Sequence, residues 1–469
     1  MANRRANSAG LDLHVELGRD GRGTRAGLEH ALRAAVRDGR LRPGTALPPS
    51  RTLAADLGLA RNTVVEAYGQ LTGEGWLVAR QGSGTRVADR AVGGPVAGEQ
   101  TPTVRPPKYD LRAGFPDITQ FPRGEWIAAS RAALTAAPDH ALGYGPPGGL
   151  PDLRTRLADY LGRARGVFTD PHRVVVCAGF TAGLRTIGNV LRRRGIRRVG
   201  VERFGHDSHR QILHDAGLEI VPLDVDADGA VPAGLSGLGA IVLTAAHQFP
   251  TGVALTAQRR AEFCRWAASS GALLVEDDYD GEFRYDRRTL GATQALAPEH
   301  VVYAGTASKT LAPGLRLGWL ALPAGLVGDV LAEQAGGHTQ PAVIEQLTLA
   351  RFVESGHYDR NIRRMRLHYR ARRERLAVGV ARRAPRCSLT GMSAGLHAVL
   401  RLPDGVTEDA AVSAAARRDL AVEGLTHFAA DGRAHPPALV IGFGAPAPRA
   451  YTTALARLFA ALAEIGAAT

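Results

Sequence analysis

One lysine stands out among the residues whose chemistry could build a site. The chain has 469 residues and 58 lysines and arginines, but only two of these are lysines. One of them, Lys309, follows an apolar run and lies in the stretch GTASKTLAPGLR. A partly desolvated lysine amine can form an imine with an aldehyde cofactor, which arginine cannot do. Groups suited to a phosphate on that cofactor lie nearby, on Thr306, Ser308 and Arg316.

Acidic residues end a second apolar run, LLVEDDY at residues 273–279. Open α/β sheets bind ligands at the carboxyl ends of their strands, where these acids would lie. A carboxylate there can pair with a pyridinium nitrogen of the cofactor and keep it protonated. Because side chains alternate along a strand, Asp277 and Asp278 point to opposite faces. We select Asp277 for this role and keep Asp278 as the alternative, with Tyr279 reaching the phenolic oxygen of the cofactor ring.

A strand, a glycine turn and a helix are predicted in VVVCAGFTAG, residues 174–183. Backbone amides at a helix N-terminus bind phosphate well. Gly179, Phe180 and Thr181 are therefore candidates for the phosphate cradle. The signal is weak by itself, because every strand–turn–helix unit contains such a turn.

These three stretches need a sheet to bring them together. From residue 109 to 465, short apolar runs alternate with long helical patterns, which predicts a largely parallel α/β sheet covered on both faces. The last part, about residues 380–465, is expected to be a smaller α+β lobe. Its predicted strands are Leu396–Leu402 and Ala438–Phe443.

The first hundred residues have a different organisation. Residues 1–23 lack apolar periodicity and are expected to form a mobile arm, and the Gly- and Pro-rich residues 88–108 read as a linker. Between them, residues 24–87 predict a helix-turn-helix with a β-hairpin wing. The expected helices, the second with Ser50 as its N-cap, are Thr24–Asp38, Pro49–Leu57 and Arg61–Leu71.

The third of these helices begins with residues suited to reading DNA. Arg61, Asn62 and Thr63 lie in its first turn, from which a recognition helix contacts base edges. Arg51 can hold a phosphate, and Gly82 at the wing tip allows close approach to a groove. The alternative is a protein-interaction module whose arginines are merely solvated. The net charge of +13 adds little, because the chain uses arginine almost everywhere it needs a base.

Composition excludes several other classes of protein. No stretch approaches the roughly 20 apolar residues of a membrane span, and no apolar segment follows the N-terminal MANRR. We therefore expect a cytoplasmic protein without a membrane partner. The three cysteines lie far apart and form no metal-binding pattern, so we predict no disulfide framework and no metal site.

The motifs of both parts resemble known families. LPPSRTLAADLGLARNTVVEAYGQLTGEGWLVARQGSGTRV is similar to the GntR-type winged helix, and the Lys309, Asp277 and Gly179 stretches resemble fold-type I pyridoxal 5'-phosphate enzymes of the aspartate aminotransferase superfamily. HQFPTG, EDDYDGEFRY and SKTLAPGLRLGW are similar to motifs of the MocR family of bacterial regulators, which joins the two domains. The resemblance implies a homodimer in which Tyr144, from LGYGPPGGLPDLR, reaches the partner's cofactor phosphate.

Three positions depart from working aminotransferases. Phe249 stands where those enzymes have an asparagine that bonds the phenolic oxygen of the cofactor, and His206 takes the place of the tyrosine that stacks on its ring. Val440 stands where the superfamily often has an arginine that clamps the α-carboxylate of the substrate, a bidentate contact that valine cannot make. Arg449, from a nearby loop, is the alternative clamp.

We therefore expect a DNA-binding transcription regulator rather than an enzyme, with at most residual transaminase half-reactions. It would bind pyridoxal 5'-phosphate through an internal aldimine on Lys309 and an operator in double-stranded DNA. The effector would be the cofactor itself or its adduct with an amino acid or amine. The PdxR-like group of the family, which lacks the clamp, suggests control of vitamin B6 genes. The alternatives are an aminotransferase with an accessory DNA-binding domain and a scaffold that binds no cofactor.

Overall fold

The computed structural model describes residues 6–8, 11–13, 24–80, 84–89, 107–285, 291–337 and 340–467. The chain divides into two compact units, Met1–Arg105 and Pro106–Thr469. Most of the predicted arm and linker, and Gly82 at the predicted wing tip, lie outside the described residues.

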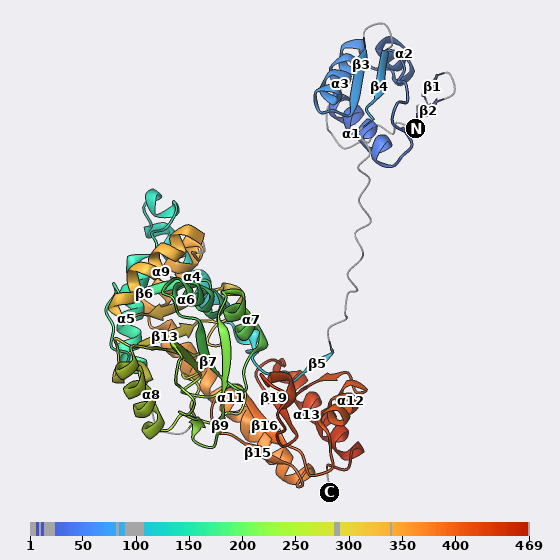
Figure 1. Ribbon diagram of the computed structural model, residues 1–469. Coiled ribbons are helices and arrows are strands. Elements are labelled where there is room, and N and C mark those ends of the chain that lie inside the picture. Colours follow the sequence, from blue (N-terminus) through green and yellow to red (C-terminus); the bar gives the residue numbers. More distant parts are fainter. Residues whose placement is uncertain are drawn as a thin grey trace. The chain divides into compact units, whose positions relative to one another are not determined.

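Three helices and a hairpin build the first unit (Figure 1). Its core is made by leucines and other apolar residues that recur at helical spacing, such as Leu28, Leu32 and Val64. The Tyr68 hydroxyl donates to the Pro48 carbonyl oxygen at 2.9 Å and ties the third helix to the loop before the second. The elements are α1 (Thr24–Arg37), α2 (Ser50–Leu57), α3 (Arg61–Gly73) and the antiparallel strands β3 (Leu77–Arg80) and β4 (Gly84–Val87). Two short strands, β1 (Ala6–Ser8) and β2 (Leu11–Leu13), pair within the predicted arm.

The prediction that Ser50 caps the second helix is wrong. Pro49 occupies the N-cap position, with φ −53° and ψ 142°, and Ser50 is the first helical residue. No side chain caps this end. Proline fixes a φ close to the one observed, so Pro49 sets the start of the helix through its backbone rather than through a side-chain hydrogen bond.

A seven-stranded sheet forms the centre of the second unit, in the order β6-β14-β13-β12-β11-β7-β8. The sheet is mixed rather than uniformly parallel, because β14 runs antiparallel to both of its neighbours. The other six strands run in one direction, so their carboxyl ends meet at one edge. The strands are β6 (Val174–Cys177), β7 (Arg198–Glu202), β8 (Glu219–Leu223), β11 (Ala240–Leu243), β12 (Leu273–Asp278), β13 (Val301–Thr306) and β14 (Gly318–Ala321).

Helices cover both faces of this sheet, as the run of apolar strands predicts. One face packs on α5 (Pro151–Arg165) and α10 (Val343–Glu354). The other packs on α6 (Phe180–Arg193) and α9 (Ala324–Gly337). The remaining helices of this part are α4 (Arg123–Ala136), α7 (Asp207–Asp215) and α8 (Ala257–Ser270).

A smaller lobe completes the unit at its C-terminal end (orange to red in Figure 1). Its sheet is antiparallel, in the order β15-β16-β19-β18. The chain enters the unit through β5 (Tyr109–Asp110), which pairs with β17 (Leu420–Ala421) of this lobe. The other elements are α11 (His357–Arg383), β15 (Ser388–Thr390), β16 (His397–Arg401), α12 (Glu408–Ala416), β18 (Glu423–Gly424), β19 (Ala438–Gly442) and α13 (Pro448–Glu464). Within the described residues, no helix is long and apolar enough to cross a membrane.

Candidate functional site

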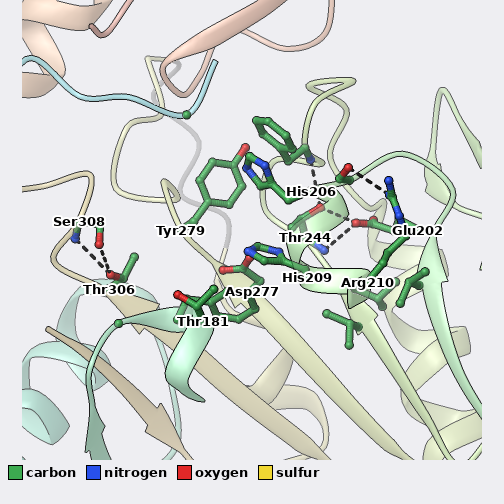
Figure 2. A pocket seen from close by; sticks show the side chains of 18 of the residues that line it. Thr181, Glu202, His206, His209, Arg210, Thr244, Asp277, Tyr279, Thr306 and Ser308 are labelled. Atoms are coloured by element: carbon green, nitrogen blue, oxygen red, sulfur yellow. Dashed lines mark hydrogen bonds between the residues drawn. The ribbon is translucent and has the colours of Figure 1, made fainter. Parts of the chain in front are cut away.

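A cavity of about 240 Å³ opens at the carboxyl ends of the parallel strands (Figure 2). Ligands of open α/β sheets bind at this edge. The residues predicted to bind the cofactor come from separate strand ends, and all but one of them line this cavity. Those that do are Gly179, Phe180, Thr181, His206, Asp277, Tyr279, Thr306, Ser308, Lys309 and Arg316.

The two neighbouring acids of β12 take opposite directions. Asp277 lines the cavity, and its Oδ1 is buried without a hydrogen-bond partner among the described residues. Asp278 points to the other face, where its Oδ2 accepts hydrogen bonds from Arg165 and from the Tyr303 hydroxyl, each at 2.7 Å. Burial and the nearby Asp278 charge raise the pKa of Asp277 well above its usual range. Asp277 is thus the acid that faces a ligand, and Asp278 is the acid that holds Arg165 inside the fold.

Lys309 follows β13 by three residues and turns its amine into the cavity. Its Nζ donates a hydrogen bond to the Gly114 carbonyl oxygen at 2.5 Å. Burial lowers the pKa of Lys309, while the charge of Asp277 opposes this effect. A lysine with a lowered pKa more readily presents the neutral amine that attacks an aldehyde.

Phosphate-binding groups gather on one side of this amine. Gly179, with φ 84°, is the N-cap of α6, so the helix begins at the cavity wall. A Cβ at Gly179 would lie 3.8 Å from the guanidinium carbon of Arg316, which shows how closely Arg316 approaches this helix end. The Thr306 hydroxyl lies 2.9 Å from the Ser308 hydroxyl and accepts the Ser308 backbone N–H at 3.1 Å. Amides, hydroxyls and a cation therefore converge as an oxyanion would require.

Aromatic rings line the opposite wall. His206 stacks on Phe249 with ring centroids 4.0 Å apart and planes 14° from parallel. His209, which the sequence analysis did not select, meets the His206 ring edge-on at 5.1 Å. Burial lowers the pKa of His206 to about 4 and that of His209 to about 3, so both rings are neutral at physiological pH. The wall is flat, aromatic and uncharged, which suits the face of a heteroaromatic ring.

Glu202 at the end of β7 is a further lining residue that sequence reasoning missed. It accepts hydrogen bonds from the Thr244 hydroxyl and from the Thr244 backbone N–H, the latter at 2.9 Å. Burial raises its pKa to about 7. Its place at the end of an apolar run in VGVERFGH was an available signal, the same one that selected Asp277. Arg210 also lines the cavity, with its guanidinium bonded to the Gly205 carbonyl at 3.1 Å.

Tyr144 is the predicted residue that lies away from the cavity. Its side chain is fully exposed, in the loop that precedes α5. Val440 is fully buried in β19 among Phe204, Phe249 and Phe428, and it leaves no polar group at the position of the expected carboxylate clamp. Arg449 is exposed in the first turn of α13 and is not among the residues that line the cavity. Neither residue offers a guanidinium to a carboxylate here.

The predicted DNA-contacting residues lie on one part of the first unit. Arg61, Asn62 and Thr63 form the first turn of α3, and Arg51 lies in the first turn of α2. The side chains of Arg51, Arg61 and Asn62 are exposed, and Thr63 is half-buried. Val64 and Tyr68 on the opposite side of α3 are buried in the core and hold the helix in place.

The fold and the cavity define a protein that joins a winged helix to an aminotransferase-like unit. Residues 24–87 match the gntR family of bacterial regulatory proteins, and residues 107–433 match the aminotransferase class I and II family. The chain belongs to the MocR/PdxR-like family of transcriptional regulators, in which these two domains are combined.

Two curated relatives are regulators of this kind. The chain is 36% identical to the HTH-type pyridoxine biosynthesis transcriptional regulator PdxR of Corynebacterium glutamicum, over 89% of this chain and 91% of the relative. It is 30% identical to the probable rhizopine catabolism regulatory protein MocR of Rhizobium meliloti, over 81% of this chain and 82% of the relative.

Solved aminotransferases share the fold of the second unit. An archaeal alanine:glyoxylate aminotransferase is 23% identical, with a TM-score of 0.69 over 75% of this chain and 89% of that one. LysN, the α-aminoadipate aminotransferase from Thermus thermophilus, is 22% identical, with a TM-score of 0.68 over 76% and 91% of the two chains.

Proposed function

We propose that this regulator binds pyridoxal 5'-phosphate in the second unit and uses the cofactor, or its adduct with an amino compound, to control its affinity for an operator in double-stranded DNA. The observation that carries the proposal is the pairing of Lys309 and Asp277 in one cavity. Burial shifts both groups toward their neutral forms, and the buried Oδ1 of Asp277 lacks a partner among the described residues. A protonated ring nitrogen would supply that partner, so the residues fit the cofactor.

Each end of the cofactor has a matching set of residues. The phosphate would be held by the amides of Gly179, Phe180 and Thr181, with Thr306, Ser308 and Arg316 around it. Asp277 would hold the ring nitrogen, and Tyr279 the phenolic oxygen. The stacked pair of His206 and Phe249 would lie against one face of the cofactor ring. When bound, the cofactor supplies an aldehyde that can link to the Lys309 amine and exchange it for another amine.

The Lys309 amine also connects the cavity to the segment through which the chain enters the second unit. Its acceptor, Gly114, lies a few residues after β5, and the same segment continues along β19, where Gly442 N–H donates to the Leu111 carbonyl at 2.7 Å. A Lys309 amine that is linked to the cofactor would no longer donate the same hydrogen bond to the Gly114 carbonyl oxygen. The position of the segment that follows the predicted linker would therefore depend on whether the Lys309 amine is free or linked to the cofactor.

Sustained transamination is disfavoured by the absence of a carboxylate clamp at Val440 and Arg449. The pyridoxine biosynthesis named for the Corynebacterium glutamicum relative supports vitamin B6 genes as the target. We further propose a homodimer in which the exposed Tyr144 contacts the cofactor phosphate of the second copy.

Absorbance and DNA binding, measured together, test the proposal. Operator duplexes would first be selected from random-sequence DNA with the full chain. Wild type and Lys309→Ala would then be titrated with pyridoxal 5'-phosphate while visible absorbance and operator affinity are followed. We expect a visible band and a cofactor-dependent change in affinity in wild type only. A band without any change in DNA affinity would reject the cofactor as effector, and steady turnover of amino donors would favour an aminotransferase.

A further inference from the structure

Behind Tyr279 lies a buried polar cluster that the proposed function does not yet use. His247 follows β11, Asp280 follows β12, and His397 begins β16. All three side chains are buried, and their ligand-type atoms lie within 4.8 Å of one another. His247 and Asp280 come from HQFPTG and EDDYDGEFRY, two motifs noted in the sequence.

Hydrogen bonds connect this cluster to the cavity through Tyr279. The Tyr279 hydroxyl donates to the His247 carbonyl oxygen at 3.1 Å and lies 3.1 Å from Nδ1 of the same residue. Asp280 Oδ2 lies 2.9 Å from that Nδ1. Because an ionised carboxylate can only accept, a hydrogen bond between these two atoms places a proton on Nδ1 of His247.

Two of the nitrogen atoms that a metal ion could use face hydrogen-bonding partners instead. Nδ1 of His247 faces Asp280, and Nε2 of His397 lies 3.0 Å from the Pro250 carbonyl oxygen. Gly395 closes the cluster from another side, since a Cβ there would lie 2.4 Å from Asp280 Oδ2 and 2.3 Å from a carbon of the His247 ring. His247 and Asp280 therefore form a closely packed hydrogen-bonded pair.

Burying this pair destabilises the fold, because two of its polar atoms are left unpaired within the described part of the chain. Asp280 Oδ1 and His247 Nε2 are both buried without a hydrogen-bond partner among the described residues. Buried polar atoms are nearly always paired, and exceptions call for an explanation. A role of these two side chains in the neighbouring cavity would explain why a carboxyl and an imidazole are buried here.

We propose that His247 and Asp280 are positioning residues that hold the Tyr279 hydroxyl for the ring oxygen of bound pyridoxal 5'-phosphate; this inference rests on the proposed function. When Tyr279 turns its proton to that oxygen, its own oxygen accepts from the His247 Nδ1–H, which Asp280 continues to hold. No covalent bond forms or breaks. Phe249 beside it has no hydrogen-bonding side-chain group, so the contact falls to Tyr279.

The surroundings keep Tyr279 able to donate. Burial and the acids Asp280, Asp277 and Glu202 raise the pKa of Tyr279 well above its usual range, so the hydroxyl keeps its proton at neutral pH. Lys309 lines the same cavity, where Asp277 and Asp280 raise its pKa against the larger effect of burial. His397 is held neutral, because burial and the neighbouring His247 lower its pKa well below the usual range.

A double-mutant cycle on the full chain tests the inference. Asp280→Asn, Tyr279→Phe and the double variant would be compared with wild type for the dissociation constant of pyridoxal 5'-phosphate and the pH midpoint of its visible band. If Asp280 acts through Tyr279, Asp280→Asn should weaken binding roughly tenfold and shift the midpoint in wild type, and change neither in the Tyr279→Phe background. Equal effects in both backgrounds would overturn the inference.

Two further measurements separate the possible failures. Glu282→Gln removes another buried acid, one that accepts from Tyr160 rather than facing Tyr279, and should leave the midpoint unchanged. In the cofactor-free protein, ¹⁵N shifts of the His247 ring should report the Nδ1–H tautomer in wild type and lose that preference in Asp280→Asn. A wild type without any visible band would reject the proposed function, whereas a band with additive effects would reject only the positioning role.

Discussion

The Nζ atom of Lys309 donates a hydrogen bond to the carbonyl oxygen of Gly114, 2.5 Å away and 195 residues earlier in the chain. The contact joins the loop after β13 to the segment that enters the second unit. Gly114 has φ 87° and itself lines the cavity. The group that would hold the cofactor thus also holds the chain segment that follows the predicted linker.

Hydrogen exchange should detect a loosening of this segment when the cofactor binds. Adding pyridoxal 5'-phosphate to wild type is expected to speed amide exchange over residues 111–117, because Lys309 then no longer anchors the Gly114 carbonyl. Lys309→Ala should exchange quickly with or without cofactor. Exchange in α8, which lies outside the cavity, serves as the internal control. Cofactor-dependent exchange at 111–117 in Lys309→Ala would contradict the coupling.

Substitutions of the two neighbouring acids of β12 should affect different properties, stability for Asp278 and cofactor affinity for Asp277. Asp278→Asn breaks a buried pair with Arg165 and should lower the free energy of unfolding by roughly 3–5 kcal/mol. Asp277→Asn removes a buried acid whose Oδ1 lacks a partner among the described residues, so stability should hold while cofactor affinity falls. Urea denaturation and cofactor titration of the two variants check this. Loss of stability in Asp277→Asn alone would reverse the assignment.

Glu202 should make stability depend on pH near neutrality. Its pKa is raised from 4.5 to about 7, so the folded state holds its proton more tightly than the unfolded chain does. Stability is then lost as pH rises from about 4.5 to 7, by up to about 1.4 kcal/mol per pH unit. Urea denaturation of wild type and Glu202→Gln across this range should show the slope in wild type only. Parallel curves would contradict the raised pKa.

His209 should have the opposite effect, lowering the free energy of unfolding as the pH falls below about 6.5. Its pKa is lowered from 6.5 to about 3, so the unfolded chain takes up a proton that the folded state refuses. Stability is therefore lost as pH falls below about 6.5 and continues to fall toward pH 3. His209→Gln removes the titrating ring and should flatten this limb in the same denaturation experiment. An unchanged acid limb would show that other groups dominate it.

Substitutions of two arginines in the winged helix should distinguish contacts with DNA bases from contacts with phosphates. Arg61→Ala should weaken operator binding by about 1–3 kcal/mol and relax the preference at one base pair. Arg51→Ala should weaken all sequences alike and reduce the slope of log affinity against log salt by about one. Arg33→Gln is the matched control, because Arg33 is already paired with Glu74 at 2.7 Å. Anisotropy titrations at several salt concentrations measure all three, and an equal loss in the control would reject the interface.

Local pattern was sufficient for much of this protein. The order of strands and helices follows from apolar periodicity, and strand alternation alone directed Asp277 and Asp278 to opposite faces. Lys309 was conspicuous because the chain otherwise uses arginine as its base. Two details were predicted less well: Pro49 rather than Ser50 is the N-cap of α2, and β14 reverses direction within a sheet expected to be largely parallel.

Other relationships depend on contacts between segments far apart in the sequence. The bond from Lys309 to Gly114, the pairing of Asp280 with His247 and the closure of that pair by Gly395 each join separate strand ends or loops. A sequence pattern reports which face of its own element a side chain occupies. It does not report which distant element packs on that face. Burial, and with it the pKa of Glu202 and His209, is set by that packing, so only the tertiary structure decided them.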